Sequence, residues 1–305
     1  MNLRLISFRP ALVSAYCLVF LWSAKHFGLP VDRIAVVSWL LGALVCGNSG
    51  KPSREQLVMI RDWVILVALL FAYEYSRGIA DQLGTRVHMT AIRDVDRFLF
   101  FGNDPNVWVQ SHFNISNKVS WYEFPLAVIY MTHFVFPVLV AVTLWLQNRN
   151  EWSRYLRRFA LLLGSGVATY ILFPVAPPWM AARDGYMDRI ARITARGWRK
   201  MGLSTVSEVF ERGKEITNPV AALPSLHAAF SLLVVVFFFK WMSTPWRIFA
   251  LILPLSMAFA LVYFGEHYVT DILLGWLYVG AASYVATRYE QKKLVAIAVA
   301  ETTSS

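Results

Sequence analysis

The chain has 305 residues, of which 57% are hydrophobic and only 16% are charged, so it is too apolar to be an ordinary soluble domain. Its formal net charge of +10 comes from 29 lysines and arginines against 19 acidic residues. In a membrane protein such an excess reflects topology or contact with anionic lipid, so we expect membrane lipids as partners and no nucleic acid.

Apolar stretches of the length needed to cross a bilayer recur along the chain. A helix rises about 1.5 Å per residue, so about 20 apolar residues span the hydrocarbon core. We therefore predict an all-α, polytopic membrane helix bundle of about eight transmembrane helices. The predicted segments are residues 11–29, 31–47, 57–75, 124–146, 156–176, 226–241, 247–264 and 268–288.

The first segment follows a basic start, and no small-residue cleavage pattern ends it, so we interpret it as a retained helix rather than as a signal peptide. The second and sixth segments are short for membrane spans. The two cysteines, Cys17 and Cys46, lie in apolar stretches without metal-ligand spacing, which favours simple packing.

Two long connections, residues 78–123 and 177–225, mix charged and aromatic residues in a way that bare linkers do not. We expect them to fold as interfacial helices or caps. The stretch HMTAIRDVDRFLFFG, residues 88–102, has apolar residues at helical spacing beside charged ones. It indicates either a helix lying on the membrane surface or a helix packed on the bundle.

Basic residues are concentrated in the short connections on one side of the predicted bundle, for example Arg149, Arg154 and Lys292. The short connections on the other side offer little beyond Arg33. The positive-inside rule then places both termini in the cytoplasm. The long connections and the turn at residues 264–268 are expected on the extracytoplasmic or lumenal side.

Three separate segments converge on that outer side: FPVAPPW (173–179), LPSLH (223–227) and FGEHYVTD (264–271). In the last of them His267 and Asp271 are four residues apart, so on a helix they share one face. The carboxylate can accept the Nδ1 proton of the imidazole and leave Nε2 as a nucleophile or base. A hydrogen-bonded pair at the membrane interface, without catalysis, is the alternative.

The segment around His227 adds the features of an anion site. Pro224 preorganises the first turn of the predicted helix, Ser225 offers a hydroxyl, and the free N–H groups of a helix start bind phosphate. With the histidine and carboxylate of the last segment, this arrangement would supply a nucleophile, an acid and an orienting group. Two histidines and an aspartate also suit a metal, but no third strong ligand is near unless Glu266 serves, so we predict no metal site.

The motifs PSLH and HYVTD, each at a predicted helix start, resemble the second and third signature motifs of the type 2 phosphatidic acid phosphatase superfamily. Together with FPVAPPW, they are similar to the branch that contains inositol phosphorylceramide synthase, over about residues 120–290. The superfamily's first motif, Lys-x6-Arg-Pro, has no copy in this chain, and FPVAPPW stands in its place. This departure leaves the phosphate-binding cations unassigned.

The resemblance implies a division of the chain into three parts. These are N-terminal transmembrane helices with an interfacial loop (1–119), a catalytic helix bundle (120–290) and a cytoplasmic tail (291–305).

The resemblance also implies the role of each residue. His267 would attack the phosphorus of a lipid phosphoester and form a phosphohistidine, while Asp271 orients it. His227 would protonate the leaving alkoxide and then activate the acceptor, which is water in a phosphatase and a hydroxyl in a transferase. Such an enzyme needs no metal and no cofactor. Protein donors must then meet the charge on the phosphoryl oxygens, among them Ser225 with the first-turn amides and at least one guanidinium.

Two arginines are candidates for that guanidinium. Arg77 ends the third predicted helix on the outer side, where Glu74 or Asp81 could hold its side chain; a simple headgroup anchor is the alternative. Arg183 lies just beyond FPVAPPW, but the basic run that follows it favours contact with anionic lipid as the alternative.

From these residues we expect a lipid phosphotransferase that moves a phosphoalcohol headgroup such as phosphoinositol. Hydrolysis of a lipid phosphate or polyprenyl diphosphate is the alternative, since both reactions use the same motifs. A non-enzymatic lipid-binding or transport protein is a further alternative, against which the complete set of two histidines and Asp271 argues. His133 is interpreted as a buried hydrogen-bonding residue, because a catalytic role requires the site to reach about 13 Å below the helix start.

Overall fold

The computed structural model describes residues 8–27, 33–50, 52–82, 86–114, 119–202, 208 and 220–303. Within its helices it leaves the side chains of residues 33, 34, 36, 37, 69, 70, 72–82, 297 and 298 undescribed. Every regular element of this described part is a helix, and two isolated β-bridges take the place of a sheet. The all-α prediction is therefore confirmed.

The chain forms two compact units, Met1–Ala72 and Tyr73–Ser305. The first unit contains α1 (Phe8–Phe27), α2 (Arg33–Asn48) and the first part of α3 (Ser53–Gln82). In this unit α1 and α2 pack around Trp39, whose ring lies 5.4 Å from that of Tyr16 and 5.1 Å from that of Phe20. Gly42 allows this approach, since a Cβ there would lie 2.8 Å from the Tyr16 ring.

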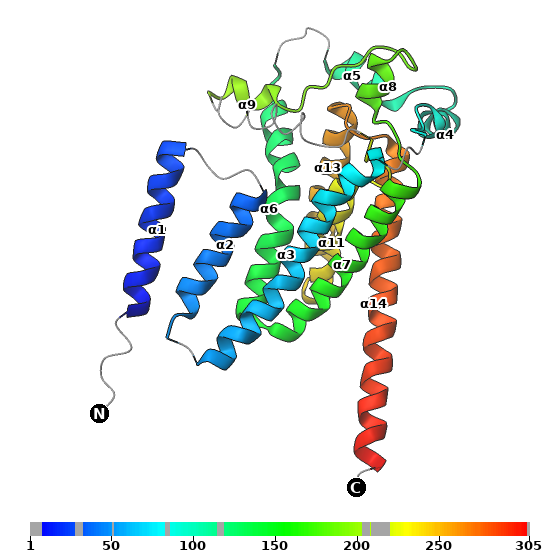
Figure 1. Cartoon of the computed structure of the whole chain (residues 1–305). Helices are drawn as coiled ribbons and strands as arrows, with labels where there is room; N and C mark the ends of the chain where they lie inside the picture. The colour runs from blue at the N-terminus through cyan, green and yellow to red at the C-terminus, as the bar shows by residue number, and fades with distance from the viewer. Residues whose placement is uncertain are drawn as a thin grey trace, which may run out of the picture. The chain divides into compact units, whose positions relative to one another are not determined.

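The second unit is a bundle of long helices with a layer of short helices at one end (Figure 1). The bundle contains α6 (Glu123–Gln147), α7 (Arg149–Leu172), α11 (Leu226–Phe238) with the 3-10 turn η1 (Phe239–Trp241), α12 (Thr244–Ala250), α13 (Ile252–Tyr263) and α14 (Val269–Thr303). The layer contains α4 (Ala91–Leu99), α5 (Pro105–Phe113), α8 (Pro178–Arg183) and α9 (Arg196–Lys200). Helix α11 contacts α6, α7, α13 and α14, and its apolar sequence suits a helix with protein on most sides.

Among the residues that the structure describes, three helical segments are long and apolar enough to cross a membrane: Glu123–Gln147, Thr244–Tyr263 and Val269–Thr302. Two shorter apolar helices, Ser38–Asn48 and Leu226–Trp241, lie at the second and sixth predicted segments, which the sequence already marks as short. Each predicted segment overlaps a helix of the structure. The number of membrane crossings stays a prediction.

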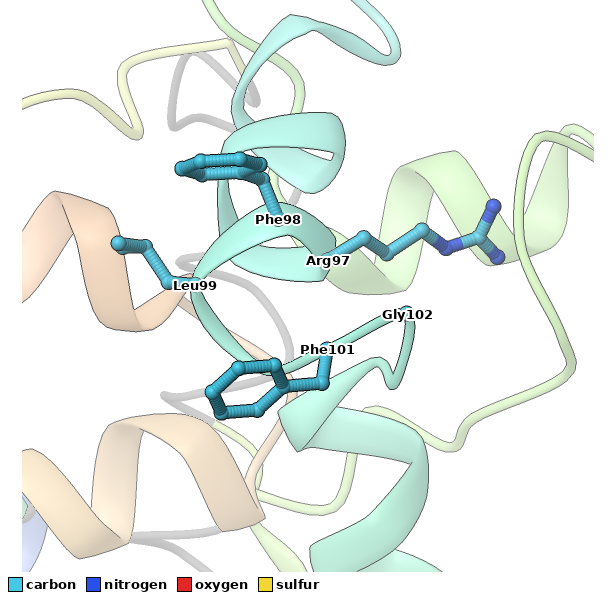
Figure 2. A pocket seen from close by; sticks show the side chains of 5 residues that line it. All are labelled: Arg97, Phe98, Leu99, Phe101 and Gly102. Carbon is cyan, nitrogen blue, oxygen red and sulfur yellow. The ribbon is translucent and has the colours of Figure 1, made fainter.

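The two long connections contain the layer of short helices, in keeping with their mixture of charges and aromatics. Helix α4 packs Ile92 and the fully buried Asp96 against the bundle. Phe98, 83% exposed, and Phe101, 96% exposed, border an open hollow of about 640 Å³ at the end of this helix (Figure 2). The stretch at 88–102 therefore has one face packed on the bundle and another that is apolar and exposed.

The segment FPVAPPW lies between two distant parts of the chain and joins them. Val175 forms parallel β-bridges with His88 on one side and with Ala221 on the other. The Val175 N–H donates to the Val220 carbonyl at 2.9 Å, and the Ala176 N–H donates to the His88 carbonyl at 3.1 Å. The backbone that leads into LPSLH is thus fixed just beyond the end of α7.

Helices α11 and α14 meet at their first turns. Ser225 caps α11 by accepting the Ala228 N–H at 3.3 Å, and its own N–H donates to the Asp271 carbonyl at 2.9 Å. One turn along α14, Gly275 lies so close that a Cβ would stand 2.5 Å from the Ser225 carbonyl oxygen. Only a residue without a side chain leaves room for this contact, which sets the distance between the LPSLH and GEHYVTD motifs.

Replacing Gly275 by alanine is expected to push these first turns apart, because the new Cβ would overlap the Ser225 carbonyl oxygen. We expect the free energy of unfolding to fall by about 1–3 kcal/mol, the usual cost of overpacking. Thermal unfolding in detergent micelles measures this change. Gly280 is the matched control on the same helix, since a Cβ there meets nothing within 4 Å. Equal stability of G275A and G280A would contradict the close contact.

Candidate active site

The histidines and the aspartate of LPSLH and GEHYVTD lie together where α11 meets α14. Nε2 of His267 is 3.4 Å from Nδ1 of His227, and Nδ1 of His267 is 3.4 Å from Oδ2 of Asp271. His267 is 5% exposed and Asp271 is fully buried, whereas His227 is partly buried. Two histidines 40 residues apart and one carboxylate thus form a continuous row of ionisable groups.

One arrangement of protons gives each contact in this row a donor and an acceptor. When Asp271 accepts the Nδ1–H of His267, Nε2 of His267 keeps a lone pair that faces the Nδ1–H of His227. In this arrangement Nε2 of His267 could act as a nucleophile, and Nδ1 of His227 opposite it could donate a proton. Both distances exceed the usual hydrogen-bond length of about 2.7–3.2 Å.

Aromatic rings of α6 pack on His227. The rings of His133 and Tyr130 stack with its imidazole, with centroid distances of 3.9 and 4.8 Å. His133 follows the first residue of α6, Glu123, by ten positions, which is about 15 Å along the helix axis. The start of α11 therefore lies beside the middle of α6 and not beside its first turn. The row of ionisable groups lies at the level of His133 along the axis of α6.

Side chains from the layer of short helices hold the turn that carries His267. Asp96 of α4 accepts the N–H groups of Val269 and Thr270, at 2.8 and 2.9 Å, and so caps α14. Asn106 of α5 donates to the His267 carbonyl at 3.0 Å. Both Asp96 and Asn106 are almost completely buried, so these bonds hold the start of α14 from within the protein.

A buried ion pair holds the residue next to His267. Arg192 donates to both oxygens of Glu266 at 2.8 and 3.0 Å, and the Thr194 hydroxyl donates to the same carboxylate at 2.5 Å. The guanidinium also lies over the Trp179 ring of FPVAPPW, 4.5 Å from its centroid. Burial acts to raise the pKa of Glu266, but the charge of Arg192 and these hydrogen bonds outweigh it and lower the pKa. Glu266 is therefore an ionised anchor of the turn.

Glu266 is the residue that the sequence offers as a third metal ligand, and its carboxylate is occupied by the protein. Its two oxygens bind Arg192 and Thr194. In the described ranges no group of three His, Cys, Asp or Glu side chains is arranged to hold a metal ion.

The predicted phosphate-binding residues differ in their surroundings. Ser225 is fully buried, and its hydroxyl oxygen caps α11. Arg183 pairs with its neighbour Asp184 at 2.6 Å, and its side chain is 60% exposed. Arg77 belongs to α3, but its side chain lies outside the described residues.

The basic run after Arg183 contains residues whose role the sequence does not reveal. Arg192 binds Glu266, and Arg196 binds Glu123 at 2.9 and 2.6 Å, so neither serves simply as a surface for anionic lipid. The partners in these pairs are 74 and 73 residues apart, and no local pattern could have matched them.

Comparison with known proteins adds two findings. Residues 90–285 match the sequence model of the PAP2 superfamily, a region that begins just before α4 and includes His227, His267 and Asp271. The chain is also 23% identical over 268 residues to the phosphoinositol dihydroceramide synthase of Bacteroides thetaiotaomicron, which covers 85% of this chain and 84% of that relative. No solved structure matches the chain.

Asp96→Ala is expected to loosen the first turn of α14, because the N–H groups of Val269 and Thr270 lose their buried acceptor. Loss of a helix cap costs about 1–2 kcal/mol, measured as a fall in the free energy of unfolding. Hydrogen exchange at Val269 and Thr270 should also become faster. Asp94→Ala is the control on the same helix, since Asp94 is 55% exposed and pairs with its neighbour Arg93. Exchange that is unchanged in D96A would argue against the cap.

We expect the Arg192–Glu266 pair to make the free energy of unfolding depend on pH in the acid range. Because the folded-state pKa of Glu266 lies below its ordinary value of 4.5, the stabilisation is complete above pH 4.5 and is lost as pH falls through the folded-state pKa. Glu266→Gln should lower the unfolding temperature at neutral pH and lose less stability than the wild type between neutral pH and acid. Parallel pH curves for wild type and E266Q, recorded by thermal unfolding in detergent, would contradict this assignment.

Proposed function

The chain belongs to the PAP2 superfamily, and from this premise we propose that it is a membrane-embedded lipid phosphotransferase. It is a membrane protein that modifies lipids, with three helices of membrane-spanning length among its described residues. In the proposed reaction a phosphoalcohol headgroup, such as phosphoinositol, passes from one lipid to another through a phosphohistidine at His267. The row of Asp271, His267 and His227, with 3.4 Å at each step, carries the proposal.

The first half-reaction transfers the headgroup to the enzyme. Nε2 of His267 attacks the phosphorus, so a P–N bond forms while the P–O bond to the leaving lipid alcohol breaks. His227 starts as an imidazolium, and the leaving oxygen takes the proton from its Nδ1, the atom that faces Nε2 of His267, which leaves the ring neutral. Asp271 keeps the other ring proton on Nδ1 of His267 and stabilises the positive charge that develops on that ring.

The second half-reaction reverses these steps with a different alcohol. His227, now neutral, accepts the proton of the acceptor hydroxyl as its oxygen attacks phosphorus and releases His267. A lipid hydroxyl as acceptor gives transfer, and water gives hydrolysis. Similarity to a protein named phosphoinositol dihydroceramide synthase supports transfer, as does the FPVAPPW segment in place of the first signature motif.

Charge on the phosphoryl oxygens must be met by protein groups, for which we propose Arg77, Arg183 and the start of α11. Ser225 supports this role by capping α11, which keeps the first-turn amides oriented beside His227. The first turn of α14 is less suited, because Asp96 and Asp271 already accept N–H groups there.

The proposal includes a topology of about eight membrane crossings with both termini cytoplasmic and the site on the extracytoplasmic or lumenal side. It also keeps the division into residues 1–119, 120–290 and 291–305. The layer of short helices lies at the end of the bundle where α14 begins (Figure 1). Its exposed Phe98 and Phe101 suit contact with lipid at the membrane interface, from which a lipid substrate would enter.

The decisive experiment gives the purified protein phosphatidylinositol with a labelled headgroup and a panel of acceptors: a ceramide, a diacylglycerol and water alone. We expect label on a lipid product and, after rapid quenching, label on the wild-type protein as phosphohistidine. His267→Ala should abolish the trapped label and lower turnover by about 10³-fold or more.

His112→Ala is the control, since His112 lies at the exposed end of α5 and bonds only within its own helix turn among the contacts described. Release of free labelled phosphoinositol in place of a lipid product would establish hydrolysis. Undiminished turnover by H267A would remove His267 from the mechanism.

A further inference from the structure

A stack of rings links α6 and α11 beside the proposed catalytic row. His227 stacks with Tyr130 and with His133, and His133 in turn stacks with Phe230 at a centroid distance of 5.5 Å. Tyr130 and His133 belong to α6, while His227 and Phe230 belong to α11, each pair three residues apart. The rings of the two helices therefore interlock, and Phe159 of α7 continues the stack on Phe230 at 4.8 Å.

This stack restricts the imidazole of His227. The His133 ring is inclined by 29° to it at 3.9 Å, which is face-to-face contact, and Phe134 meets it edge-on at 5.9 Å and 84°. Rotation of the His227 ring about its Cβ–Cγ bond would drive its edge into these neighbours. Nδ1 of His227 consequently stays directed at Nε2 of His267.

His133 suits this position better than an aliphatic residue of the same bulk. A flat ring can lie against another ring, and its face attracts the partner when the partner carries a positive charge. His227 has to alternate between a charged and a neutral ring during the two half-reactions. The ionisable groups that face it are His267 from the turn before α14 and Tyr130 and His133 from α6, with Asp271 behind His267.

We infer that His133 is a positioning residue for the reaction: its imidazole, stacked on His227, holds that ring in the orientation from which Nδ1 delivers a proton to the leaving alcohol. The inference rests on the proposed function and adds a third histidine to it. His133 is 6% exposed and acts through His227, so it is not itself a catalytic residue.

The test compares two leaving groups on the same headgroup. Phosphatidylinositol releases an alkoxide, which needs the proton of His227 when the P–O bond breaks, whereas a nitrophenyl ester of phosphoinositol releases a nitrophenolate that is stable without one. His133→Leu should lower kcat for the lipid substrate by about tenfold or more, with little change in KM, and should lower kcat for the nitrophenyl ester by about twofold at most. His133→Phe, which keeps a flat ring in the stack, should recover most of the lipid activity.

Phe230→Leu is the matched control, because it removes a ring from the same stack one step away from His227. It should lower the unfolding temperature about as much as His133→Leu and leave the ratio of the two kcat values unchanged. Equal losses on both substrates in H133L, or a failure of H133F to recover lipid activity, would overturn the inference. If wild type turns over neither substrate, the proposed function fails instead, and the two failures are thereby distinguished.

Discussion

The backbone contact between the first turns of α11 and α14 is the constraint on which the site depends. The Ser225 N–H binds the Asp271 carbonyl at 2.9 Å, and Gly275 leaves no room for a side chain against the Ser225 carbonyl. Each helix carries its histidine within or directly before its first turn. When the two helix starts are held this close, His227 and His267 have to face one another across a few ångströms.

The turn that carries His267 has buried backbone groups that need partners within the protein. The two long connections supply the missing partners. Gln110 donates to the carbonyls of Ala191 and Tyr263, and Asn106 donates to that of His267, so α5 joins the second long connection to the turn. This explains why long polar connections accompany a chain that is otherwise mainly apolar helix.

Asp96, which caps α14, and the exposed Phe98 lie on the same nine-residue helix, α4. Its buried Asp96 binds the first turn of α14, while Phe98 is exposed and lines the same hollow as Phe101 (Figure 2). The exposed aromatic side chain of Phe98 and the buried cap of the His267 turn therefore belong to one short helix. The carboxylate of Asp271 also makes two contacts, because its Oδ2 lies next to Nδ1 of His267 and accepts the Tyr268 N–H.

The all-α class and the approximate positions of the long helices could be predicted from the sequence, because apolar length acts within a single helix. The four-residue spacing also predicted that His267 and Asp271 lie close together, but His267 belongs to the turn two residues before α14, so the two residues do not share a helix face. The predicted topology placed LPSLH and GEHYVTD on the same side of the bundle, whereas their catalytic roles rest on the proposal above.

The depth of His133, the pairing of Arg192 with Glu266 and the cap from Asp96 became known only from the folded protein. Asp96 and Thr270 are 174 residues apart, and Arg192 and Glu266 are 74 apart. A periodic pattern indicates which face of a helix is buried. It does not indicate which other helix packs on that face, or at which position along the helix axis. Those relations are set by packing, by where a glycine lets two backbones touch and by which buried polar group still needs a partner.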